Sequence, residues 1–176
     1  MLLRKINAVI SLLITFLLLG HAISISVWAL SKGSIPEHSG IVPWILTGLV
    51  VIHAFISIDM VISGLLNGEK HKSKKYLKLN ASTVFQRASG ILMIVFIGLH
   101  IAGSAGYMQP PKIVHAILPV LFFTMVMAHI VVSTSKAFIT LGIGNARFIK
   151  LVDIVIRVIC GVVLIADVIG FYLYLV

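Results

Sequence analysis

Five long apolar runs constrain this 176-residue chain more than any other feature of its sequence. A helix needs roughly 20 consecutive apolar residues to cross a hydrocarbon core about 30 Å thick. Apolar residues make up 60% of the chain and charged residues only 11%, so we expect an all-α, polytopic membrane protein without a soluble domain. The runs predict one transmembrane domain, 1–176, with helices at about 6–30, 41–66, 82–106, 112–138 and 148–175.

The distribution of cations between the runs predicts the orientation of these helices. Lys and Arg give the chain a formal net charge of +9. Most of these cations lie before the first run, in 67–81 and around 139–150, whereas the alternate loops hold only Lys32 and Lys112. Because positive loops stay on the cytoplasmic side, we expect the N-terminus inside and the C-terminus outside. Cations confined to short breaks between apolar runs are not typical of a nucleic-acid interface, so we expect no nucleic-acid partner.

Four of the seven histidines lie well inside apolar runs, one in each of the first four. They are His21, His53, His100 and His129. A polar side chain inside a membrane is costly unless it has a partner, so each of them marks a candidate functional site. Any single one could instead hydrogen-bond a neighbouring helix. Their occurrence in four consecutive helices favours a shared cofactor.

The expected depths of these histidines sort them into two pairs. At 1.5 Å per residue, His21 lies roughly 24 Å and His100 roughly 27 Å from the inner end of its helix. His53 lies roughly 20 Å and His129 roughly 13 Å from the inner face, and an error of one turn in the helix ends makes them level. Two imidazoles facing each other across a bundle suit six-coordinate haem iron. The pattern predicts two haem b groups, and a zinc or copper site is the alternative.

Small residues near the histidines favour a bulky planar ligand, although close helix packing also uses them. They are Gly20, Ser24, Gly90, Gly98, Gly103, Gly161 and Gly170. The single cysteine, Cys160, supports neither a disulfide framework nor an iron–sulfur cluster. Any iron–sulfur chemistry therefore belongs to a partner.

The segment Gln86-Arg87-Ala88-Ser89-Gly90, followed by His100, resembles the cytochrome b membrane subunit of succinate:quinone oxidoreductases and quinol:fumarate reductases, in its five-helix dihaem branch. The resemblance covers the whole chain in helix number and in the pattern of one histidine per helix. It implies that His21 and His100 ligate the iron of an outer haem, and that His53 and His129 ligate the iron of an inner haem. Some menaquinol:fumarate reductases carry a glutamate at the position of Met127, so their proton route is not implied here.

The function implied by this resemblance is electron transfer between membrane quinone, expected to be menaquinone, and flavoprotein and iron–sulfur subunits. These partners would dock on the inner face of a prokaryotic cytoplasmic membrane, and this chain would perform no dicarboxylate chemistry by itself. Two alternatives stay open. One is a cytochrome b subunit of another membrane dehydrogenase or reductase, and the other is a haem-free transporter or scaffold with metal-binding histidines.

Polar residues near the two faces provide further candidates. Near the inner face, contacts with a haem propionate or quinone are expected from Gln86, Arg87, Ser89 and Arg157, although a snorkelling role is the alternative for Arg87. Near the outer face, a quinone headgroup could find hydrogen-bond donors and a proton acceptor, or these residues could simply be solvated. The outer group consists of Glu37, His38, Lys112 and His115.

The remaining intramembrane charges have less specific roles. Asp153 and Arg157 are spaced i, i+4 and are expected to pair on one helix. Asp59 and Asp167 have no obvious local partner, so each could carry protons or accept a hydrogen bond from a serine. The lysine-rich loop at 70–78 could dock an iron–sulfur subunit or contact anionic lipid.

Overall fold

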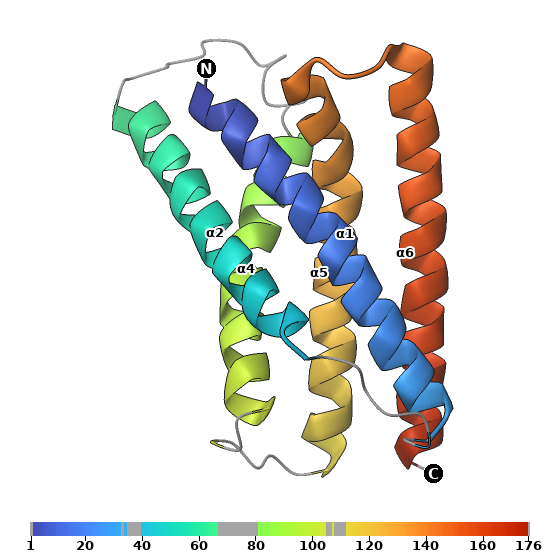
Figure 1. Ribbon diagram of the computed structural model, residues 1–176. Helices are drawn as coiled ribbons and strands as arrows, with labels where there is room; N and C mark the ends of the chain where they lie inside the picture. Colours follow the sequence, from blue (N-terminus) through green and yellow to red (C-terminus); the bar gives the residue numbers. More distant parts are fainter. Residues whose placement is uncertain are drawn as a thin grey trace.

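The structure is a computed structural model that describes residues 2–32, 34, 40–66, 81–104, 107 and 112–175. It contains five long helices, and each is long and apolar enough to cross a membrane, so the predicted all-α membrane fold is confirmed. Their ends lie within four residues of the expected ranges. The helices are α1 (Leu2–Leu30), α2 (Val42–Leu66), α4 (Ala81–Ser104), α5 (Lys112–Leu141) and α6 (Ala146–Leu175) (Figure 1).

Successive helices run in opposite directions along the bundle (Figure 1). The end of the bundle that holds Leu2 also holds the last residues of α2 and α5 and the first residues of α4 and α6. We call it the N-terminal end, and the opposite end the C-terminal end. The cytoplasmic location of the N-terminal end stays a prediction from the loop charges.

A tight turn joins α5 to α6. Gly142 and Gly144 have φ angles of 74° and 87°, a left-handed conformation that glycine adopts without steric cost. Asn145 then caps α6, because its side-chain Oδ1 accepts a hydrogen bond of 2.9 Å from the backbone N–H of Phe148. The turn therefore places α5 and α6 side by side and antiparallel.

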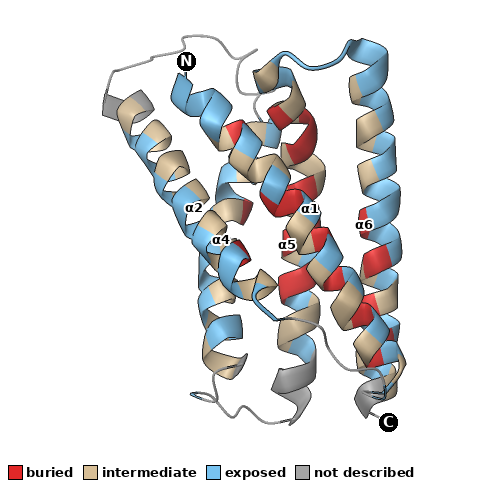
Figure 2. Ribbon diagram, in the orientation of Figure 1, coloured by how far each residue is buried: buried red, intermediate tan, exposed pale blue. Residues whose placement is uncertain are grey.

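The hydrophobic core lies between α1, α5 and α6, whose buried segments are visible in Figure 2. In the described part of α2 and α4, the only buried residues are Leu46 and Ser89 respectively. The helices that carry His53 and His100 are thus the least packed of the five. The core cluster comprises Leu19, Ala22, Phe122, Phe123, Val126, Met127, Ile130, Cys160 and Val163.

The helix contacts form a simple pattern. Helix α1 packs against α2, α5 and α6, and α5 also packs against α4 and α6. Among the described residues, neither the pair α1 and α4 nor the pair α2 and α5 forms an extensive direct contact. Each of the two expected histidine pairs is therefore carried by helices that are not packed closely against each other.

Candidate functional site

The helix bounds place the four intramembrane histidines at two levels. At 1.5 Å per residue, His21 lies about 28 Å along α1 from Leu2, and His100 lies about 28 Å along α4 from Ala81. From the same end of the bundle, His53 lies about 20 Å along α2 and His129 about 18 Å along α5. The inner pair is more nearly level than the sequence-based depths of 20 and 13 Å suggested, because α5 extends to Leu141.

His129 is held by a hydroxyl of the neighbouring helix. The Oγ of Ser89, on α4, lies 2.9 Å from Nδ1 of His129 and donates a hydrogen bond of 3.1 Å to the backbone carbonyl of Gln86. A serine hydroxyl has one hydrogen. If Gln86 takes that hydrogen, His129 in the tautomer with its proton on Nδ1 donates to Ser89, and the lone pair of the neutral ring then resides on Nε2. A ring oriented in this way through Nδ1 is typical of metal-ligating histidines.

A half-buried cation continues this polar contact between α4 and α5 toward the N-terminal end. Lys136 lies two turns after His129, and its Nζ donates to Oε1 of Gln86 at 3.0 Å and to Oγ1 of Thr83 at 3.5 Å. From the sequence, Lys136 is predicted only to be one of the cations flanking 139–150 that set the topology. Its spacing of seven residues from His129, which places both side chains on one helix face, was the signal for a site role.

His53 lies close enough to His129 to interact with it electrostatically. Its Nδ1 is buried and has no hydrogen-bond partner among the described residues, and the same is true of Oδ1 of Asn7. Asn7 is a neighbour, because its backbone lies near the His53 ring and its Nδ2 donates to Oγ of Ser57 at 3.2 Å. An unpaired buried polar atom costs about 1–3 kcal/mol. Two such atoms beside the inner pair fit a position at which a further group binds.

The outer histidines have different surroundings. His21 lines a shallow pocket of about 240 Å³, which also includes Gly20, Ser24 and Val42. The His100 ring stacks on Phe122 of α5, with 5.2 Å between the ring centroids and 24° between the planes. The structure thus provides an apolar surface for each imidazole, while α1 and α4 share no extensive contact within the described ranges.

The six glycines among the expected small residues fall into three groups. A Cβ atom added to Gly90 would lie 3.5 Å from Cε1 of His129, so this glycine borders the imidazole. A Cβ added to Gly170 would lie 2.9 Å from Cβ of Ala29, so this glycine serves close packing of α6 on α1. Added Cβ atoms at the other four glycines have no such neighbour within 4 Å, so close helix packing does not require them to be glycine. These are Gly20, Gly98, Gly103 and Gly161.

The inner-face candidates differ in their positions. Gln86 and Ser89 face α5 and His129, whereas Arg87 is exposed. The predicted pair of Asp153 and Arg157 is present at 3.8 Å. Their side chains are 35% and 66% exposed, so the ion pair itself contributes little to stability.

The three aspartates in the helices differ in their exposure and in their hydrogen-bond partners. Asp153 also accepts a hydrogen bond from Ser135 of α5. Asp59 is exposed on α2, whereas Asp167 is fully buried and bonded to Ser26 of α1, a partner that the sequence did not identify.

The expected outer quinone group lies outside the part of the chain that the structure describes. This applies to Glu37 and His38 and to the side chains of Lys112 and His115, whose backbone forms the first turn of α5. It also applies to the lysine-rich loop at 70–78, which contains His71. Their roles therefore stay predictions.

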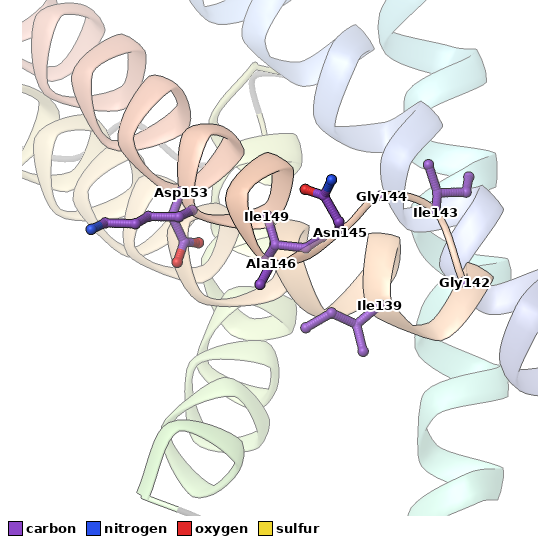
Figure 3. Close-up of a pocket in the computed structure, with 9 residues that line it drawn as sticks. Ile139, Gly142, Ile143, Gly144, Asn145, Ala146, Ile149 and Asp153 are labelled. Atoms are coloured by element: carbon purple, nitrogen blue, oxygen red, sulfur yellow. The ribbon is translucent and has the colours of Figure 1, made fainter.

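A larger cavity, of about 510 Å³, lies beside the α5–α6 turn (Figure 3). Its lining includes Ile139, Asn145, Ile149 and Asp153 and none of the four intramembrane histidines. This cavity is therefore separate from the histidine site.

The arrangement of possible ligands favours pairs over a compact metal centre. Within the described residues, no group of three or more His, Cys, Asp or Glu side chains is placed to hold a metal ion. A structural zinc site needs four protein ligands, whereas six-coordinate haem iron needs only two. Fold and site together define a five-helix membrane protein with four intramembrane histidines at two levels. Comparison with protein families, curated proteins and solved structures finds no match for this chain.

Proposed function

We propose that this chain is a dihaem cytochrome b that passes electrons between membrane quinone and the soluble flavoprotein and iron–sulfur subunits of a succinate dehydrogenase or fumarate reductase complex. One observation carries the proposal. His129, whose Nδ1 lies 2.9 Å from Oγ of Ser89, lies about level with His53 in the bundle, although α2 and α5 do not pack closely. The bond leaves Nε2 of His129 available as a ligand.

The residues present fit two haem b groups. His53 and His129 would hold the inner haem, with two unpaired polar atoms of Asn7 and His53 beside it. His21 and His100 would hold the outer haem. When bound, haem supplies reversible one-electron transfer at iron between the ferrous and ferric states.

The protein's own groups orient the ligands and exclude water. The Ser89 hydroxyl, which is hydrogen-bonded to the Gln86 carbonyl, contacts Nδ1 of His129 and would orient the ring for ligation through Nε2. Phe122, which is buried in the core, covers one face of His100. Near the N-terminal end, Lys136 and Gln86 offer a cation and an amide to a propionate, and Arg87 and Arg157 are further candidates for the same contact.

The quinone and partner sites follow from the expected topology. We place the quinone, expected to be menaquinone, at the outer group of Glu37, His38, Lys112 and His115. The inner region beside Ser89 and Arg87 is the alternative. The soluble subunits would dock at the N-terminal end, on the inner face of a prokaryotic cytoplasmic membrane.

A visible spectrum of the purified full chain tests the haem assignment directly. We expect a Soret and an alpha band that respond to dithionite, and a pyridine haemochrome ratio of two haem b per chain. The His71→Ala variant is the control, because the loop histidine should leave the ratio unchanged. A protein expressed with sufficient haem that shows neither band would refute the proposal and favour the haem-free alternative.

A further inference from the structure

A fully buried carboxyl group lies at the contact between α1 and α6. Asp167 has 0% exposure. One of its oxygens, Oδ1, is hydrogen-bonded to Oγ of Ser26, and the other, Oδ2, is buried with no partner among the residues described. The group lies about 32 Å along α6 from Ala146, and therefore toward the C-terminal end.

The single hydroxyl hydrogen of Ser26 favours a protonated Asp167 carboxyl. The Ser26 Oγ lies 2.9 Å from the backbone carbonyl oxygen of Ala22 and within hydrogen-bond distance of Oδ1 of Asp167. Both partners are acceptors if Asp167 is ionised, and Ser26 has only one hydrogen to give. A protonated Asp167 removes this competition, because the carboxyl can then give its own hydrogen to Ser26 while Ser26 gives its hydrogen to Ala22.

The electrostatic surroundings of Asp167 also favour the protonated carboxyl. Helices α1 and α5 pack against α6, and no charged or titratable side chain in their described residues interacts with Asp167. An ionised carboxylate there would be an unpaired charge in an apolar interior, which is strongly unfavourable. Asp153 provides the contrast, because it has a similar serine contact but is half-exposed and lies 3.8 Å from Arg157.

The packing around Asp167 identifies the ligand as a proton. One turn further along both helices, a Cβ added to Gly170 would lie only 2.9 Å from Cβ of Ala29. The two helices are therefore in close contact beside the carboxyl, and a metal cation with its ligand shell would have to separate them. A proton needs no such space.

We propose that Asp167 and Ser26 form a proton-binding site in the membrane interior, in which the Asp167 carboxyl holds a solvent-exchangeable proton at neutral pH. The site is built from α1 and α6 alone. It therefore does not depend on the haem assignment.

Infrared spectroscopy of the full chain in lipid at pH 7 tests the proposal. We expect a carboxylic-acid C=O band above the amide I region that shifts to lower wavenumber after transfer to D₂O. Asp167→Asn should remove the band. This variant keeps the shape of the neutral acid, and its amide can donate to Ser26, so it should fold.

Two further variants make the result specific. Ser26→Ala keeps the acid but removes its acceptor, so the band should move to higher wavenumber. Asp153→Asn is the matched control and should leave the band in place. The proposal is overturned if no band depends on Asp167, or if a band that depends on Asp167 does not respond to prolonged exchange in D₂O.

Discussion

Replacing Ser89 by alanine tests the inner site most directly. The substitution removes the hydroxyl that lies 2.9 Å from Nδ1 of His129 and leaves the ligand histidine itself in place. If His129 ligates haem iron through Nε2, the ring loses the partner that fixes its tautomer and orientation. We therefore expect weaker binding of the inner haem by a protein that still folds.

The size of the effect follows from the groups that remain. Loss of an outer-shell partner of a metal-ligating histidine typically lowers metal affinity about 10- to 100-fold. The backbone carbonyl of Gln86 also lies near the His129 ring and can accept part of the lost hydrogen bond. We therefore expect the lower end of this range, a loss of about 10-fold, which corresponds to about 1.4 kcal/mol.

The assay isolates the inner haem by removing both outer ligands, His21 and His100, by substitution with alanine. Haem titration of this protein gives a dissociation constant with and without Ser89→Ala. Ser133→Ala is the matched control, because Ser133 donates at 2.7 Å to the backbone carbonyl of His129 and not to its ring. Equal affinities and equal spectra for the Ser89→Ala and Ser133→Ala proteins would refute the reasoning.

Three further predictions concern the ligands, the helix packing and the quinone. His53→Ala should remove one component from a potentiometric haem titration and His21→Ala the other; loss of the same component in both would show that the pairing is wrong. Gly170→Ala should lower the free energy of unfolding by about 1–3 kcal/mol, since its new Cβ would lie 2.9 Å from a neighbouring Cβ, whereas Gly161→Ala should not; equal stabilities would contradict the packing. Glu37→Gln should slow quinone turnover with both haems present, and unchanged turnover would move the quinone to the inner face.

The helices could be predicted from the sequence because one effect dominates their formation. In lipid, every backbone polar group must be satisfied within the segment, so an apolar run of sufficient length becomes a helix. The ends follow from local signals, as in the α5–α6 turn, where Gly142 and Gly144 supply the left-handed residues and Asn145 supplies the cap. These signals depend on neighbouring residues alone.

The polar partners could not be predicted, because they depend on how each helix is rotated about its axis. Ser26 and Asp167 are separated by 141 positions, and no local pattern relates them. The contact of Ser89 with His129 likewise needs α4 to turn one particular face toward α5. The sequence placed Ser89 in the inner region, but it could not show that the serine hydroxyl lies against Nδ1 of His129.

Polar contacts also explain how the two sparsely buried helices are held. Apolar side chains gain little from leaving lipid, so α2 and α4 need no large core of their own, and hydrogen bonds between helices become the specific attachments. Ser89 and Gln86 attach α4 to α5 through His129 and Lys136, and Ser57 attaches α2 to α1 through Asn7. The bonds of Lys136 with Gln86 and of Asn7 with Ser57 lie on the side of the inner histidines toward the N-terminal end. The protein therefore holds the ring of His129 by a hydrogen bond of its own, so a change at Ser89 should be measurable as a change in ligand geometry and not only as a loss of fold.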